Sequence, residues 1–210
     1  MVFGISPGQK TTRGLATTTS ILSYVGKQLD PYLGATGKMY GWQDLYLQDY
    51  PIIGKRWMAN CDIPDLDLLP QHFGIKSIKF SAGMESSILH FGIWLLSWLV
   101  RMKLPLNLPN YSKFLLKLSH LFDYFGSDDG GMHMIIKGKD KQGNQKTIKW
   151  FIIAKEGHGP HIPTIPSIIL AKKLTQGTLK VNGAMTSINL VTLKEYLDEL
   201  RGLNIITYVS

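Results

Sequence analysis

The sequence has a single cysteine, Cys61, among its 210 residues. One thiol cannot form a disulfide within the chain, and such sparse use of cysteine is typical of a reducing compartment. The start of the chain also lacks a basic segment followed by an apolar run and a small-residue cleavage site, which is the pattern of a secretory signal. These absences predict a cytoplasmic protein.

Long apolar runs are missing as well. The longest uncharged apolar stretch lies between Glu85 and Arg101, and it is shorter than the roughly 20 apolar residues that a membrane-spanning helix needs. The stretch also contains His90 and Gly92. We therefore expect a buried helix there.

Acidic residues are few: 15 of them stand against 23 lysines and arginines, which gives a net charge of +8. Such an excess permits binding to nucleic acid or to an anionic membrane without requiring either. The lysines between Lys137 and Lys149 are the most concentrated, but they lack the interleaved aromatic residues of a base-stacking surface. They indicate a solvated sheet face, and we expect no nucleic-acid partner.

No cofactor-binding motif is complete. A dinucleotide fold needs G-x-G-x-x-G between a strand and a helix, and the start made by Gly157-His158-Gly159 fails because Ile162 occupies the third glycine position. The segment Gly4-Ile5-Ser6-Pro7-Gly8 matches the G-x-S-x-G of a nucleophile elbow. However, an oxyanion hole needs the backbone N–H of the residue after the serine, and proline has none. We expect a turn there, and no cofactor bound by this chain alone.

Periodicity and turn residues predict an α+β fold in one domain, residues 1–210, because long helices are grouped and strands are linked as hairpins. The clearest hairpin joins Met132–Lys139 to Gln145–Lys155 through the turn DKQGN. Further strands are expected at Val2–Ile5, Leu45–Leu47, Lys55–Cys61, Ile75–Ala82, Ser187–Val191 and Asn204–Val209. Helices are expected after a cap at Thr11 or Thr12 as far as Val25, from Asp62 or Asp65 to Gly74, over Met84–Met102, Tyr111–Phe125 and Ser167–Leu174, and after a cap at Thr192.

Two glycine-rich loops carry the candidate catalytic residues. Asp128 and Asp129 lie in the first loop, where carboxylates suit either acid–base work and amine binding or a simple turn. His158 and His161 flank Gly159-Pro160 in the second loop, where they either line a polar cleft or lie on the surface. Their spacing also suits a metal, but no cysteine pair or carboxylate triad accompanies them. With His133 as the sole third nitrogen, we expect no metal site.

The order of several short motifs resembles the C-terminal domain of saccharopine-dehydrogenase-like oxidoreductases over nearly the whole chain. The motifs that carry the resemblance are Arg13-Gly14-Leu15, Ile21–Gly26, Cys61-Asp62-Ile63-Pro64-Asp65, the segment from Ala82-Gly83 to Arg101, Phe125–Asp128, Gly130-Gly131-Met132, Gly159-Pro160 and Ile162-Pro163.

This resemblance implies a mixed, largely antiparallel sheet covered by helices, similar to the C-terminal domain of glyceraldehyde-phosphate-dehydrogenase-like folds. Such a domain binds the substrate, forms a homodimer and faces an NAD(P) nicotinamide held by a Rossmann domain, which does the hydride chemistry. The Rossmann domain would act in cis or in trans, and we expect an exposed apolar patch for it near residues 1–15 or 157–170. By position, Arg13, Ser127 and His133 would bind the substrate.

The alternative function is a non-catalytic interaction module. The helices expected between residues 84 and 125 carry Trp94 and Trp98 together with Arg101, Lys103, Lys113 and Lys117. Aromatic and basic residues in this combination are typical of a peripheral contact with an anionic membrane, or of a surface for a protein partner.

Overall fold

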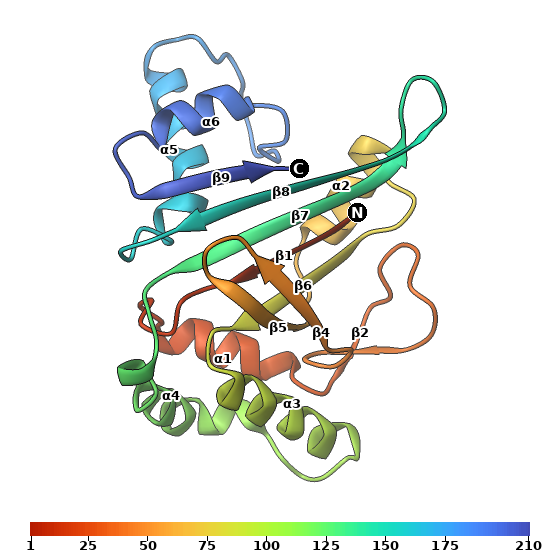
Figure 1. The fold of residues 1–210 in the computed structure, drawn as a ribbon, viewed down its shortest axis with the longest axis vertical. Helices are drawn as coiled ribbons and strands as arrows, with labels where there is room; N and C mark the ends of the chain where they lie inside the picture. Colours follow the sequence, from red (N-terminus) through yellow and green to blue (C-terminus); the bar gives the residue numbers. More distant parts are fainter.

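A computed structural model describes all residues, 1–210, as a mixed α+β fold built on a curled, mostly antiparallel sheet (Figure 1). The strand order is β4-β5-β6-β1-β7-β8-β9, and only the pair β1 and β6 is parallel. The predicted fold class is therefore confirmed at this level. The strands are β1 (Val2–Ser6), β4 (Tyr46–Tyr50), β5 (Gly54–Asn60), β6 (Lys79–Met84), β7 (Gly130–Lys139), β8 (Gln145–Ala154) and β9 (Ile205–Val209), with β2 (Gln28–Leu29) and β3 (Met39–Tyr40) forming a separate two-stranded ribbon.

Helices cover the convex face of the sheet at three places along it (Figure 1). One group packs against β8 and β9 around the buried side chains of Ile152 and Ile165, and a second group packs around Leu22 and Ala59. A single short helix packs between them around Leu66. No helix is both long and apolar enough to cross a membrane. The helices are α1 (Leu15–Tyr24), α2 (Asp65–Phe73), α3 (Ser87–Arg101), α4 (Ser112–His120), α5 (His161–Thr175) and α6 (Leu193–Glu199), with short 3₁₀ turns η1 (Leu108–Tyr111) and η2 (Asp123–Phe125).

The other face is concave because the sheet curls until β4 lies over β7 (Figure 1). Tyr50 of β4 contacts His133 of β7 and Phe151 of β8, although three strands separate β4 from β7 in the sheet order. The interior of the curl is tightly packed around Gly4. A Cβ at this position would lie 2.4 Å from the carbonyl oxygen of Ser81 and 2.8 Å from a ring carbon of His133, so only glycine fits there.

Several predicted boundaries are wrong. Gly83 does not break its strand, because β6 continues to Met84 and α3 begins only at Ser87, with the Ser86 hydroxyl as its cap. No threonine caps α1, where Gly14 occupies the cap position without a side-chain bond. The predicted 111–125 helix is divided into η1, α4 and η2, and the segment Ser187–Val191 forms no strand. The cap at Thr192 is confirmed, with a full capping box to Glu195.

Candidate functional site

The C-terminal ends of β1 and β6 meet at one edge of the sheet because these two strands are parallel. β7 begins and β8 ends at the same edge, since Gly131 pairs with both Ser6 and Ile153. Loops after parallel strands are where open sheets most often bind ligands. A cavity of about 270 Å³ lies at this edge, lined by Gln9, Glu85, Ser86, Ile88, Phe122, Phe125 and Gly126.

Glu85 joins the loops of this edge. Its Oε2 accepts the backbone N–H groups of Gln9 at 2.7 Å and Ser127 at 2.9 Å, and its Oε1 accepts the Ser127 hydroxyl at 2.8 Å. Arg56 of β5 donates to the same Oε1 at 3.2 Å, and both side chains of this ion pair are largely buried. One carboxylate therefore connects the loop after β1, the loop before β7 and strand β5. Ser127 follows Gly126 of the cavity lining, and its hydroxyl is already bound to Glu85.

Arg13 is paired within the chain. Its guanidinium donates to the Asp123 carboxylate and to the Gln9 carbonyl, and it contacts the Ser119 hydroxyl at 3.1 Å. Burial alone would raise the pKa of Asp123, but the hydrogen bonds from His120, Arg13 and Gln9 outweigh it and hold the pKa below its usual value. Because Asp123 already neutralises Arg13, a substrate anion would have to compete with it. Substrate binding by Arg13 stays a prediction.

The two candidate catalytic loops lie next to each other. Asp129 Oδ1 accepts the backbone N–H of Glu156 at 3.3 Å, and Asp128 Oδ2 lies 3.8 Å from the position that a Cβ of Gly157 would occupy. The structure therefore brings Asp128 and Asp129 beside the loop that carries His158, and the Asp128 side chain is exposed there.

His158 is held by a backbone hydrogen bond, whereas His161 is exposed. His158 Nδ1 accepts the backbone N–H of Asn204 at 2.7 Å, which leaves its Nε2 free of any protein partner. His161 begins α5 as an exposed residue, with its ring centroid 5.7 Å from that of His158. No group of three or more potential metal ligands comes together in the structure. The arrangement offers one imidazole nitrogen and two carboxylates to a polar ligand.

His133 lies in the interior, not at the cavity. It is 1% exposed, its Nδ1 is 2.8 Å from the Tyr50 hydroxyl and its Nε2 is 3.3 Å from the Tyr46 hydroxyl. Burial lowers the pKa of His133 to about 4, so the ring is neutral at physiological pH. The ring has no surface for a ligand in this conformation, so substrate binding by His133 would require Tyr46 to move.

Sequence reasoning missed Glu85 and the pair of tyrosines. A signal for Glu85 was present, because it is the sole carboxylate between Asp67 and Asp123 and it directly precedes a capped helix. Tyr46 and Tyr50 gave no such signal, since their contact with His133 depends on the curl of the sheet.

In comparisons with known proteins, no protein-family model matches the chain, and no curated protein matches it.

Proposed function

We propose that this chain is the substrate-binding and dimerisation domain of a saccharopine-dehydrogenase-like, NAD(P)-dependent oxidoreductase located in the cytoplasm. The proposal includes similarity of its sheet to the C-terminal domain of glyceraldehyde-phosphate-dehydrogenase-like folds. The observation that carries it is the meeting of the two loops, Gly126–Gly131 and Gly157–Pro163, at the sheet edge that also holds the Glu85 cavity.

The chain's own residues do not fit a dinucleotide. The glycine-rich segment Gly157-His158-Gly159 follows β8, but it leads into α5 with Ile162 where the pattern needs the third glycine, and Ile162 is buried. NAD(P) would therefore be held by a Rossmann domain in cis or in trans.

In the proposed function the chain binds and orients the substrate. The carboxylates of Asp128 and Asp129 attract an amino group, and the Nε2–H of His158, whose Nδ1 accepts the Asn204 N–H, donates a hydrogen bond to the ligand beside them. Glu85, which lines the cavity, positions this loop through its hydrogen bonds to Ser127. The ligand class that fits is an amino acid or a derivative with a secondary amine.

A thermal-shift screen of amino acids and N-substituted amino acids tests this function. We expect a ligand of this class to raise the melting temperature of the 210-residue chain, and Asp128→Asn/Asp129→Asn to abolish the shift. Asp30→Asn is the matched control, because Asp30 is exposed and makes no ion pair. A shift that survives in the double variant, or tight NADPH binding by this chain alone, would refute the proposal.

A further inference from the structure

The outward faces of α3 and α4 form the main apolar surface of the molecule. Exposed apolar side chains recur at helical spacing along α3, and a second stripe follows α4 and η2. Tyr124 and Phe125 at its end are 86% and 82% exposed. The side chains concerned are Ile88, Phe91, Leu95, Trp98 and Met102 on or just after α3, and Tyr111, Phe114, Leu118, Leu121, Tyr124 and Phe125 on the other segment. We call this surface the α3–α4 face.

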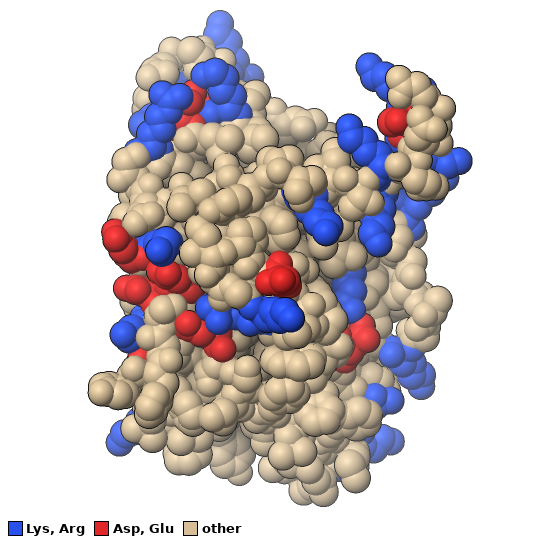
Figure 2. Space-filling view, viewed as in Figure 1, with Lys and Arg blue, Asp and Glu red and all other residues tan.

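This location differs from the expectation of a patch near residues 1–15 or 157–170. In those two segments only Leu15 and Ile168 are exposed large apolar side chains, at 38% and 40%. Figure 2 shows the end of the molecule that α3 and α4 form as mainly uncharged, with Lys and Arg at its margins.

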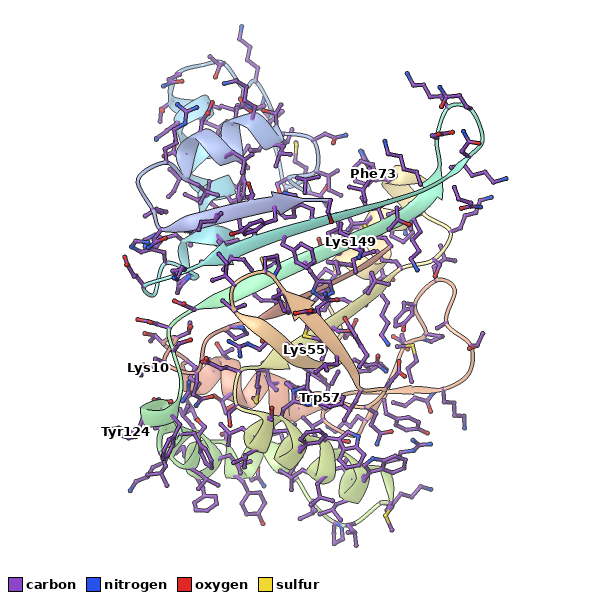
Figure 3. The ribbon with its side chains drawn as sticks, in the orientation of Figure 1. Lys10, Lys55, Trp57, Phe73, Tyr124 and Lys149 are labelled. Atoms are coloured by element: carbon purple, nitrogen blue, oxygen red, sulfur yellow. The ribbon has the colours of Figure 1, made fainter.

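The two stripes belong to one surface. The inward side chains of Leu96 on α3 and Leu115 on α4 pack against the same core cluster, so the opposite faces of both helices point away from the sheet. Ile88 of α3 and Phe125 of η2 line the same cavity, which places the start of α3 beside the end of the second stripe. Figure 3 shows side chains projecting from this end of the molecule, with Tyr124 at its margin.

Between residues 86 and 122 the charges of this surface have one sign, and Asp123, which begins η2, is paired with Arg13 and His120. Residues 86–122 contain no aspartate or glutamate. Their four cations, Arg101, Lys103, Lys113 and Lys117, are exposed and take part in none of the eight ion pairs of the structure. Arg101 instead stacks over the rings of Tyr40 and Trp98, at 4.1 and 4.8 Å from their centroids.

We propose that the α3–α4 face docks on an anionic lipid surface. The apolar side chains would enter the boundary between headgroups and acyl chains, and the four cations would meet the lipid phosphates. A second copy of the chain fits this face poorly, because symmetric packing brings its cations together without a free carboxylate between them. This inference goes beyond the proposed function, since it concerns where the domain is held and not what it binds in its cavity.

Vesicle co-sedimentation of the 210-residue chain tests the proposal. We expect binding to phosphatidylcholine vesicles that contain phosphatidylserine, weaker binding as salt rises, and little binding to phosphatidylcholine alone. Lys113→Glu/Lys117→Glu should weaken the partition about tenfold or more, because each cation near an anionic surface contributes separately. Leu95→Ser/Phe114→Ser should weaken it by a similar factor through lost apolar burial.

The matched control is Lys141→Glu/Lys146→Glu at the tip of the β7–β8 hairpin, which changes the net charge equally on exposed lysines elsewhere. The vesicle partition of this control should stay within about twofold of that of the parent chain if the lipid site is confined to the α3–α4 face. Four results would overturn the proposal: an equal loss in the hairpin variant, equal binding to neutral vesicles, no binding to either kind of vesicle, or a dimer in analytical ultracentrifugation that dissociates in Leu95→Ser/Phe114→Ser. Because the charge variant alters exposed positions only, it remains a valid test if the apolar variant fails to fold.

Discussion

Replacing Glu85 with alanine should destabilise the protein more than the loss of an exposed carboxylate. The change removes three hydrogen bonds, at 2.7, 2.8 and 2.9 Å, from Gln9 and Ser127, and an ion pair at 3.2 Å with Arg56. The Arg56 side chain is 12% exposed and its Nε already lacks a partner, so the variant leaves a nearly buried guanidinium without a counter-charge.

The size of the effect follows from these contacts. Removing one partner of a buried ion pair costs about 3–5 kcal/mol, and the orphaned backbone N–H groups lie within the same network, so their cost is not simply added. For a chain of this length each kcal/mol lowers the melting temperature by roughly 2–4 °C. We therefore expect a fall of roughly 6–20 °C, and a matching loss in the free energy of unfolding by urea.

Two further variants separate the causes. Asp30→Ala, an exposed carboxylate without an ion pair, should change the free energy of unfolding by less than about 0.5 kcal/mol. Adding Arg56→Met to Glu85→Ala should recover part of the loss, because it removes the stranded charge. A loss below about 1 kcal/mol in Glu85→Ala, or no coupling to Arg56→Met, would refute the idea that this carboxylate holds the loops together.

Three other changes probe buried positions. Tyr50→Phe should cost about 1–3 kcal/mol in urea unfolding, because it leaves the buried Nδ1 of His133 unpaired; equal stability would mean that the bond contributes nothing. Gly4→Ala should cost at least about 3 kcal/mol, since the new Cβ would lie 2.4 Å from a backbone oxygen, whereas Gly138→Ala, with open space around it, should be near neutral. Burial lowers the pKa of His90 to about 4 from 6.5, so the unfolded chain takes up a proton first and stability falls as pH drops from 6.5 towards 4. His90→Leu should remove about 3 kcal/mol of this loss in the free energy of unfolding. An unchanged dependence of stability on pH in this variant would contradict the role given to His90.

Local signals predicted the elements that depend on them. The β7–β8 hairpin was expected at Met132–Lys139 and Gln145–Lys155, and it forms within two residues of those bounds because the turn and the alternation act over short distances. The capping box at Thr192 needs only a glutamate three residues on, and it is present.

The start of α5 shows why other elements were missed. Two prolines, Pro163 and Pro166, suggested that the helix begins after them, yet it begins at His161. The first proline lies in the first turn, where no backbone N–H is needed. The second cannot donate to the carbonyl of Ile162, and the hydroxyl of Tyr196 on α6 donates to that carbonyl instead, at 3.2 Å. A partner 34 residues away replaces the lost bond, and no local pattern contains that information.

The candidate site was predictable in its loops but not in its centre. Glycine-rich composition identified the segments of Asp128, Asp129 and His158, and these segments do lie together. Glu85 is different, because its hydrogen-bond partners lie 76 and 42 residues away along the chain. They reach it only because β1 and β6 run parallel and end at the same edge of the sheet, and the parallel pairing is a property of the whole topology.

The two proposals share one element, and this has a physical consequence. α3 begins at the Glu85 cavity, where Ile88 and Ser86 line the wall, and the same helix supplies Leu95 and Trp98 to the α3–α4 face. A lipid surface that holds Ile88 and Phe125 restricts the motion of two side chains that line the cavity. Since coupling between two binding sites is reciprocal, a ligand that fills the cavity should alter vesicle affinity by the same factor by which vesicles alter ligand affinity. No coupling would mean that contact with the lipid does not change the shape or the motion of the cavity.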